Sequence, residues 1–263
     1  MKAEKENIFL TIVMPALNEE KNIAAAVNTT LEAFEGFSID GEIIVINDGS
    51  TDGTENLVRE LIEKNERLRM IKHDVPRGIG ASFWDGVDNA SGNFVVMMPG
   101  DNENDPLEIF RYCRLLEHVD LVIPFTFNRE VRSVFRNFLS FVYRFIINTT
   151  FMVNFNYTNG TVLYRKSVLD ELDYRSDGFF FQTDILVRTV KKGYLFAEVP
   201  YKLKMRGDGA SKAVSFPSLI QVVRGYLRLV SNYYFMKDNQ VLNGYAKDSL
   251  TLTRKKVPDE LKR

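Results

Sequence analysis

The chain of 263 residues lacks several features that would assign it to a special class. Its one cysteine, Cys113, rules out a disulfide within the chain and fits a reducing compartment. No uninterrupted apolar run reaches the roughly 18 residues that a membrane-spanning helix needs. Residues 1–6, MKAEKE, lack the basic and then apolar pattern of a signal peptide. We therefore expect a protein that is soluble or lies on a membrane surface.

The net charge is also small, −1, but the two signs are unevenly distributed. Residues 1–120 carry 11 Lys and Arg against 23 Asp and Glu, whereas residues 121–263 carry 23 against 12. An acidic half that holds a cation and a basic half that faces phosphates would produce this split, and so would chance and solvated helix faces. The composition, 45% hydrophobic and 26% charged without repeats, suits one globular domain or a domain with an appendage.

The first half of the chain alternates short apolar runs with helical patterns. Strands are expected at 9–14, 42–46, 69–72, 94–98 and 120–124, and helices at 19–34, 54–65, 78–90 and 107–116. This order predicts an α/β fold with a doubly wound, mostly parallel sheet flanked by helices. Ligands of such sheets bind at the carboxyl ends of the strands, where the turns at Pro15, Asp48 and Asp101 are expected to lie.

The most informative stretch follows the apolar run 94–98. Three carboxylates spaced two apart come after it, Asp101, Glu103 and Asp105. Oxygen ligands of this kind suit Mg²⁺ or Mn²⁺, ions that commonly bind together with substrate phosphates. An ordinary acidic turn is the alternative, because Asp, Asn and Gly are frequent turn residues.

The second half contains two long helical patterns rich in aromatic residues, 131–153 and 216–236. Neither contains an acid, and the arginines within them are Arg132, Arg136, Arg144, Arg224 and Arg228. Broad apolar faces with few arginines are typical of amphipathic helices in a membrane interface, and packing on the sheet or on a partner subunit is the alternative. Residues 246–263 are expected to form a polar, frayed tail.

Five sequence blocks occur in a recognisable order. They lie at 14–20 (MPALNEE), 46–54 (INDGSTDGT), 77–92 (beginning RGIGA), 101–103 (DNE) and 198–212 (containing EVP and RGDGASK). With them the chain resembles the glycosyltransferase family 2 enzymes of GT-A fold, and more closely the polyprenyl-phosphate glycosyltransferases of the dolichol-phosphate mannose synthase group. The resemblance implies a GT-A catalytic domain over 1–212 that includes an amphipathic helical insertion at 131–153. An amphipathic C-terminal segment at 213–245 and the tail at 246–263 would follow.

The resemblance implies a site for a nucleoside-diphosphate sugar, linked to either UDP or GDP. The residues implied in binding this donor are Pro15, Leu17, Glu19, Asp48, Arg77, Asp101, Asn102, Glu103, Arg206 and Lys212. Asp101 and Glu103 match the family's Asp-X-Asp motif with Glu in place of the second Asp, and Asp105 is a third implied ligand of Mg²⁺ or Mn²⁺. A turn residue that caps the next helix is the alternative for Asp48, and a surface charge is the alternative for Arg77.

The resemblance also implies a polyprenyl phosphate acceptor. The residues implied in binding its phosphate are Arg129, Arg132, Arg136, Ser140 and Ser211, since guanidinium pairing supplies both charge and orientation. The residues expected to be catalytic are Asp101, Glu103, Asp184 and Arg206. Asp184 would act as a base if the acceptor were a hydroxyl, and a helix N-terminal Asp stabilised by the dipole is its alternative. A cap of a helix is the alternative for Ser211.

We therefore expect an inverting, metal-dependent enzyme that moves a hexose-type sugar to a dolichyl or undecaprenyl phosphate. It would be cytoplasmic and peripheral on the inner face of the membrane, with a homo-oligomer or a membrane protein as a further partner and no nucleic acid. A family 2 transferase that acts on a sugar hydroxyl is one alternative, and a non-catalytic sugar-nucleotide-binding module is another. A nucleotidyltransferase would show a Gly-rich Lys/Arg signature near the first strand, which residues 16–19 do not supply.

Overall fold

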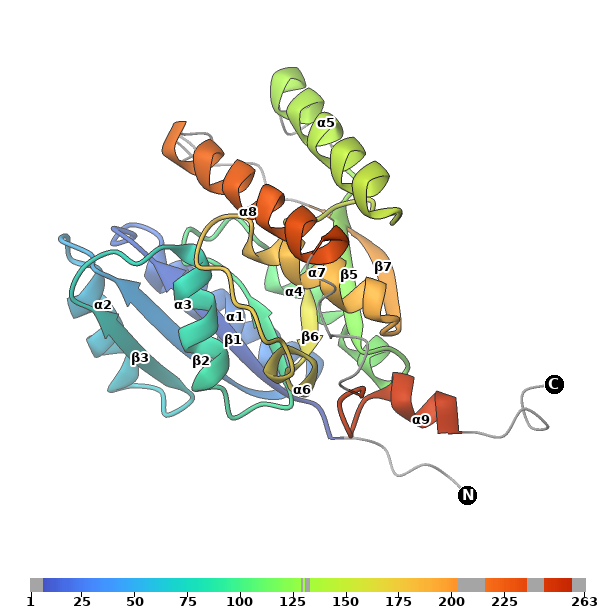
Figure 1. The fold of residues 1–263 in the computed structure, drawn as a ribbon. Helices are drawn as coiled ribbons and strands as arrows, with labels where there is room; N and C mark the ends of the chain where they lie inside the picture. Colours follow the sequence, from blue (N-terminus) through green and yellow to red (C-terminus); the bar gives the residue numbers. More distant parts are fainter. Residues whose placement is uncertain (1–6, 129, 131–132, 203–215, 236–243, 257–263) are drawn as a thin grey trace.

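The computed structural model describes residues 7–128, 130, 133–202, 216–235 and 244–256. A seven-stranded sheet runs through this part of the chain in the order β3-β2-β1-β4-β6-β5-β7 (Figure 1). Neighbouring strands are parallel except where β6 pairs with β4 and with β5. The strands are β1 Phe9–Ala16, β2 Asp40–Asp48, β3 Leu68–His73, β4 Phe94–Met97, β5 Leu121–Thr126, β6 Leu163–Arg165 and β7 Phe196–Tyr201. The predicted α/β architecture with a mostly parallel sheet is confirmed.

Helices cover both faces of the sheet (Figure 1). The helices of the described residues are α1 Ile23–Phe37, α2 Thr54–Ile62, α3 Ile79–Asp88, α4 Pro106–Phe110, the 3₁₀ helix η1 Cys113–Glu117, α5 Val134–Phe151, α6 Lys166–Asp170, α7 Phe181–Lys192, α8 Phe216–Tyr234 and α9 Leu250–Lys256. The predicted strand–helix alternation of the first half is therefore present, although the predicted helix 107–116 is divided into α4 and η1.

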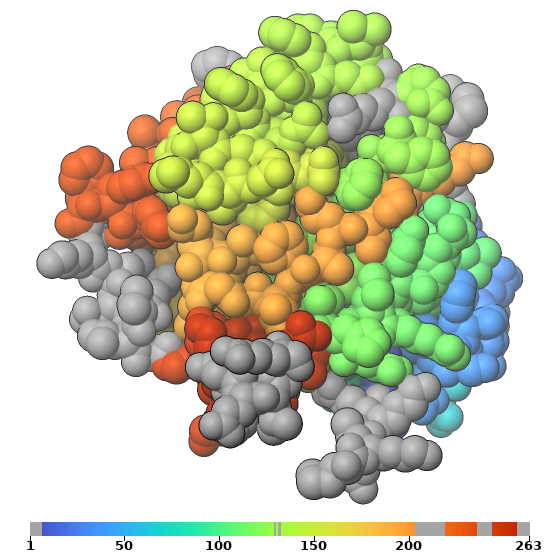
Figure 2. Space-filling model, turned by 90° about the vertical axis from the view of Figure 1, so that its right-hand side faces the viewer, coloured from blue at the N-terminus to red at the C-terminus, as the bar shows by residue number. Residues whose placement is uncertain are grey.

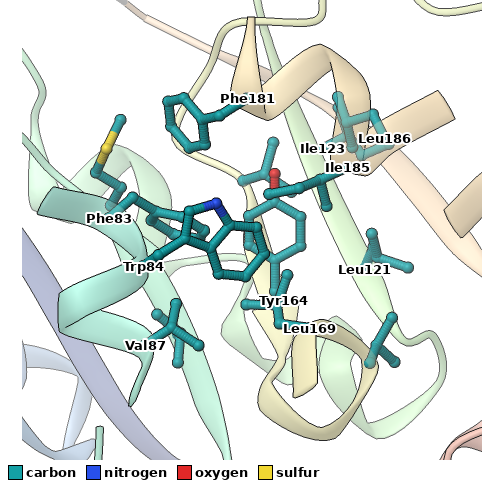
Figure 3. Close-up of a cluster of buried hydrophobic side chains, with 14 of the residues drawn as sticks. Phe83, Trp84, Val87, Leu121, Ile123, Tyr164, Leu169, Phe181, Ile185 and Leu186 are labelled. Atoms are coloured by element: carbon teal, nitrogen blue, oxygen red, sulfur yellow. The ribbon is translucent and has the colours of Figure 1, made fainter. Parts of the chain in front are cut away.

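Each face of the sheet has its own core because successive side chains of a strand point in opposite directions. Leu10, Ile12 and Met14 of β1 belong to the core that includes α1, α2 and α4, whereas Val13 belongs to the core that includes α3 and α7. Figure 3 shows the second core, in which aromatic and aliphatic side chains of α3, β5, β6, α6 and α7 meet: Phe83, Trp84, Val87, Leu121, Ile123, Tyr164, Leu169, Phe181, Ile185 and Leu186.

The predicted start of the first helix is wrong. The sequence predicts a helix from residue 19 with Asn18 as its N-cap, but residues 18–22 form a turn before α1, and Asn18 lies in the left-handed region with φ 57°. The helix begins at Ile23, with Asn22 at its N-cap. The backbone of this turn is hydrogen-bonded to the loop after β2 instead of continuing a helix.

The expectation of a frayed tail is wrong for residues 246–256. Helix α9 packs where β5 and β7 begin, and Leu195 N donates to Thr251 Oγ1 over 2.8 Å. Fully buried Asp120 accepts from Leu250 N at 2.8 Å, from Thr251 N at 3.1 Å and from the Thr251 hydroxyl. The guanidinium of Arg165, also fully buried, lies 3.3 Å from Asp120. This segment is therefore part of the packed domain.

Helices α5 and α8 keep apolar faces exposed after packing. Of α5, only Ile147 and Phe151 are buried, whereas aromatic side chains such as Phe138 and Phe145 stay about 60% exposed. Tyr226 of α8 shares a 2.8 Å hydrogen bond between its hydroxyl and that of Thr150 in α5. In Figure 2 the α5 segment (yellow-green) forms the top of the molecule. Among the described helices, none combines the length and apolar character needed to span a membrane.

Candidate active site

The carboxyl ends of β1 and β4 are joined by backbone hydrogen bonds. Met98 N donates to Val13 O and Gly100 N donates to Pro15 O, both at 2.9 Å. A β-carbon on Gly100 would come within 2.7 Å of Ile23 Cδ1, the end of that side chain, so glycine allows this close approach without moving Ile23. Asp101 therefore begins its turn directly beside the Pro15 loop.

The loops after β1 and β2 hold each other in place. Glu19 N donates to Thr54 Oγ1 at 2.9 Å, and Asn18 Oδ1 accepts from Thr51 N at 2.8 Å. The Glu19 carboxylate is half-buried and accepts from the Asn22 amide at 2.9 Å. Leu17 is also half-buried, so both donor-site candidates of this loop lie in a fixed turn at the edge of the sheet.

Asp48 ends β2 and is 5% exposed. Its Oδ1 accepts from Arg77 N and faces His73 Nδ1, both at 2.7 Å, and its Oδ2 accepts from Gly78 N at 2.9 Å. Burial alone raises the pKa of Asp48, but the hydrogen bonds from Arg77, His73 and Gly78 outweigh it and hold this pKa below its ordinary value. A carboxylate has about four acceptor positions. Since these contacts use three, a fourth position has no partner among the described residues and could accept from a ligand.

His73 is a member of this site that the sequence did not reveal. It is paired in register with Asp48 at the end of β3, and its Nε2 lies 2.8 Å from Asp85 Oδ2. Arg77 Nη1 donates to the same oxygen of Asp85 at 2.6 Å. Each imidazole nitrogen faces a carboxylate oxygen, so the ring links Asp48 to Asp85. The clue available in the sequence was that His73 directly follows the predicted strand 69–72, and that Asp48 lies in the turn after the predicted strand 42–46.

We expect Asp48→Asn to flatten the loss of stability in acid. Because folding depresses the pKa of Asp48, its ionised form stabilises the fold above the unfolded pKa of about 3.9, and this contribution disappears as the pH falls toward the folded pKa. Urea unfolding at several pH values between 7 and 3 measures the effect. The wild type should lose more stability below pH 5 than the variant does. Parallel curves would contradict the assignment, and exposed Asp74→Asn is the control.

The acids after β4 do not form a ready-made three-ligand metal site. Asp101 Oδ1 accepts from Glu103 N at 3.0 Å, whereas Asp105 Oδ1 caps α4 by accepting from Leu107 N at 3.1 Å. In the part of the chain that the structure describes, no three His, Cys, Asp or Glu side chains are grouped to hold a metal ion. The three implied ligands are thus present in one turn without converging on one point.

The turn nevertheless fits a cation that arrives with phosphates. Asn102 lies in the left-handed region with φ 56°, and its buried Oδ1 has no hydrogen-bond partner among the described residues. This unpaired oxygen stands in the chain between the carboxylates of Asp101 and Glu103. Mg²⁺ is usually held by one or two carboxylates together with substrate phosphates, a requirement that this partial set meets.

Asp184 is buried near the start of α7. It is 2% exposed, and its Oδ2 lies 2.7 Å from Arg188 Nε, one turn further along the helix. The preceding Thr183 hydroxyl lies 2.7 Å from the Tyr143 hydroxyl of α5. A carboxylate engaged in this way has to give up an ion pair before it can accept a proton.

The predicted acceptor residues are described only in part. Arg129, Arg132, Arg206, Ser211 and Lys212 lie outside the described residues. Arg136, Ser140 and Arg144 follow one another at intervals of four along α5 and therefore share a face of the helix. Ser140 and Arg144 line a cavity of about 30 Å³, and Arg144 Nη1 donates to Asn156 O at 2.8 Å.

A mostly parallel sheet with acids at the ends of β2 and β4 is the architecture of a GT-A glycosyltransferase. Among solved structures, glucosyl-3-phosphoglycerate synthase from Mycobacterium tuberculosis, in complex with Mn²⁺, UDP and phosphoglyceric acid, has a similar fold. The TM-score is 0.66 at 21% identity, covering 85% of this chain and 78% of that chain.

Residues 11–173 match the model of Glycosyl transferase family 2, and the chain belongs to this family. Dodecaprenyl-phosphate galacturonate synthase of Rhizobium johnstonii is 25% identical over 236 residues, which cover 88% of this chain and 68% of the relative. Polyprenol monophosphomannose synthase of Mycolicibacterium smegmatis is 28% identical over 223 residues, which cover 76% and 79%. The protein is therefore a glycosyltransferase, and the predicted family is confirmed.

Proposed function

We propose that the protein transfers a hexose-type sugar from a nucleoside-diphosphate sugar to a polyprenyl phosphate, with inversion at the anomeric carbon. The observation that carries this proposal is that Asp48 and the Asp101–Glu103 turn lie at the same edge of the sheet, at the carboxyl ends of the two strands that flank β1. The names of the two curated relatives, both polyprenyl-phosphate sugar synthases, support the acceptor class.

The donor would bind across the ends of β1, β2 and β4. The one remaining acceptor position of Asp48 suits an N–H of the base or a ribose hydroxyl, next to Pro15, Leu17 and Glu19. Asp101 and Glu103 would hold Mg²⁺ or Mn²⁺ against the diphosphate. A cation there neutralises the charge that develops on the departing diphosphate.

A phosphate acceptor accounts for the state of Asp184. An oxygen of a lipid phosphate is already ionised near neutral pH, so its attack depends on in-line positioning and charge stabilisation rather than on a strong base. The ion pair with Arg188 makes Asp184 a poor candidate for such a base. Arg136 and Ser140, on one face of α5, would bind the acceptor phosphate.

A polyprenyl chain is apolar and lies in a membrane, so the enzyme has to reach the membrane surface. The exposed aromatic face of α5 and the apolar face of α8 suit contact with the interface. We infer a peripheral position on the cytoplasmic face of the membrane.

Measured sugar transfer tests this proposal. UDP- and GDP-sugars with and without Mn²⁺ are first screened by thermal shift, because a ligand that binds the native state raises the Tm. The stabilising donor is then assayed with a short-chain polyprenyl phosphate and, separately, with a polyprenol that has a free hydroxyl. Transfer to the phosphate alone is expected. Transfer only to hydroxyl acceptors, or donor binding without any transfer, would refute it.

We expect Arg136→Ala to raise the KM for the lipid phosphate by about 10- to 100-fold, the worth of one charge-assisted hydrogen bond. The KM for the donor should change far less. Steady-state kinetics with each substrate varied in turn measures both values. Arg114→Ala, an exposed arginine in η1, is the control. A larger effect on the donor KM would assign Arg136 to the other substrate.

A further inference from the structure

A cavity of about 320 Å³ lies between the start of α3, the loop before α7, and α8. Its wall includes Arg77, Tyr174, Asp177, Arg224 and Arg228. Neither the acids of the β4 turn nor the α5 residues proposed for the acceptor line it. Its volume falls within the range of small-molecule sites in proteins, about 300–1,000 Å³.

The wall of this cavity carries three guanidinium groups against one carboxylate. Arg77 forms an ion pair with Asp85 at 2.6 Å. Among the described residues, no carboxylate forms an ion pair with Arg224 or Arg228, which are one turn apart on α8. The guanidinium of Arg228 lies 4.0 Å from the centre of the Tyr174 ring, so that aromatic face supports it. Two neighbouring cations that form no ion pair among the described residues favour an anionic ligand, and guanidinium groups are well suited to phosphate.

Exposed apolar side chains near the cavity indicate what kind of molecule the anionic group belongs to. Leu219, Val223 and Leu227 of α8 remain 59%, 48% and 58% exposed. Leu227 lies three positions after Arg224 and is therefore its neighbour on the helix surface, and Val223 and Leu219 continue this apolar strip at intervals of four. A molecule that joins a phosphate to hydrocarbon chains could bind both the arginines and the exposed apolar side chains of α8.

We propose that the cavity binds the phosphate of an anionic phospholipid head group, at a site that is separate from the polyprenyl phosphate acceptor and borders the donor candidates at Arg77. This lipid would hold α8 on the membrane through Arg224 and Arg228 while its acyl chains lie along Leu219, Val223 and Leu227. The inference rests on the cavity and its charges and does not depend on the identity of the sugar or of the acceptor.

Vesicle sedimentation of the full chain tests the site in the absence of donor and acceptor. Vesicles of phosphatidylcholine are compared with vesicles that contain phosphatidylcholine and phosphatidylglycerol at 4:1. We expect the wild type to bind the anionic vesicles about tenfold more tightly, and Arg224→Gln/Arg228→Gln to lose most of this preference. Because Arg228 packs on Tyr174, Arg224→Gln alone is measured as well and should lose about half of the preference on a logarithmic scale.

A matched control removes the same charge elsewhere. Lys64 and Arg114 are exposed and lie after α2 and in η1. Lys64→Gln/Arg114→Gln should therefore keep the preference within about twofold, since charges beyond a Debye length of about 10 Å from the membrane contribute little. An equal loss in both double variants would show general attraction without a site and would overturn the proposal.

Two further measurements distinguish a lipid phosphate from free phosphate, and the cavity from the reaction site. Inorganic phosphate, compared with chloride at equal ionic strength, should not displace the protein from anionic vesicles, whereas short-chain dihexanoyl phosphatidylglycerol should. Displacement by inorganic phosphate at equal potency would point to a free phosphate instead of a lipid. Transfer to a soluble short-chain polyprenyl phosphate without vesicles should stay within about twofold in Arg224→Gln/Arg228→Gln. A specific rise in the KM of either substrate would make the cavity part of the reaction site and would also overturn the proposal.

Discussion

Asp101→Asn is expected to lower kcat/KM for sugar transfer by about 10²–10³-fold, which corresponds to about 3–4 kcal/mol of lost stabilisation of the departing diphosphate. The amide keeps an oxygen that can accept from Glu103 N, so the turn after β4 should keep its shape. The Tm without ligands should therefore change little, because Asp101 lies in a loop at the edge of the sheet and not in either core.

Titration of Mn²⁺ in the presence of the donor distinguishes a lost metal ligand from a general defect. The variant should need much more Mn²⁺ to reach half-maximal rate, and its donor-induced thermal shift should no longer depend on the metal. Asp105→Asn, measured alongside, reports whether the cap of α4 also coordinates the ion. Turnover with an unchanged Mn²⁺ dependence in Asp101→Asn would remove the metal assignment.

Asp120→Ala is expected to destabilise the fold by about 3–5 kcal/mol, the usual cost of leaving one partner of a buried ion pair alone. The charge of Arg165, fully buried and stacked at 4.8 Å over the Phe94 ring, would lose its closest acid. Three donors from Leu250 and Thr251 would also lose their acceptor. The segment 244–256 should then detach from the start of β5.

The second acid near Arg165 is a matched control. Asp248 is 52% exposed in its side chain and lies 3.7 Å from Arg165, so Asp248→Ala should cost less than about 1 kcal/mol. Urea unfolding of both variants gives the two free energies of unfolding. Equal losses would show that the buried network around Asp120 does not stabilise the fold as argued.

The strands and their polar ends were accessible from the sequence because they depend on local patterns. Continuous apolar runs such as 42–46 and 94–98 predict buried strands of a parallel sheet from local sequence alone. The residues that follow these runs therefore lie at the carboxyl edge of that sheet. Asp48 and Asp101 were placed correctly for this reason. Local periodicity also identified α5 and α8 as amphipathic helices, with ends shifted by a few residues at most.

The features that were missed depend on partners far away in the sequence. The start of α1 was misplaced because Glu19 N bonds to Thr54 Oγ1, 35 residues later. His73 gained its role from Asp48 and Asp85, which only the folded sheet brings to its two nitrogens. The sequence predicts Asp120 only as the first residue of a strand, whereas its partners Leu250 and Thr251 follow about 130 positions later. No pattern of spacing within one segment contains this information.

The first and last described residues lie near the edge of the sheet where the parallel strands begin, and this position is useful for immobilising the protein. Asn7 O accepts from the Asn93 amide just before β1 and β4 begin, and α9 packs just before β5 and β7 begin. The carboxyl ends of these four parallel strands, with the candidate site, lie at the opposite edge. A molecule immobilised on a sensor chip through a linker near Asn7 or Lys256 would therefore present its catalytic edge to the flowing solution, ready for nucleotide or vesicle injections.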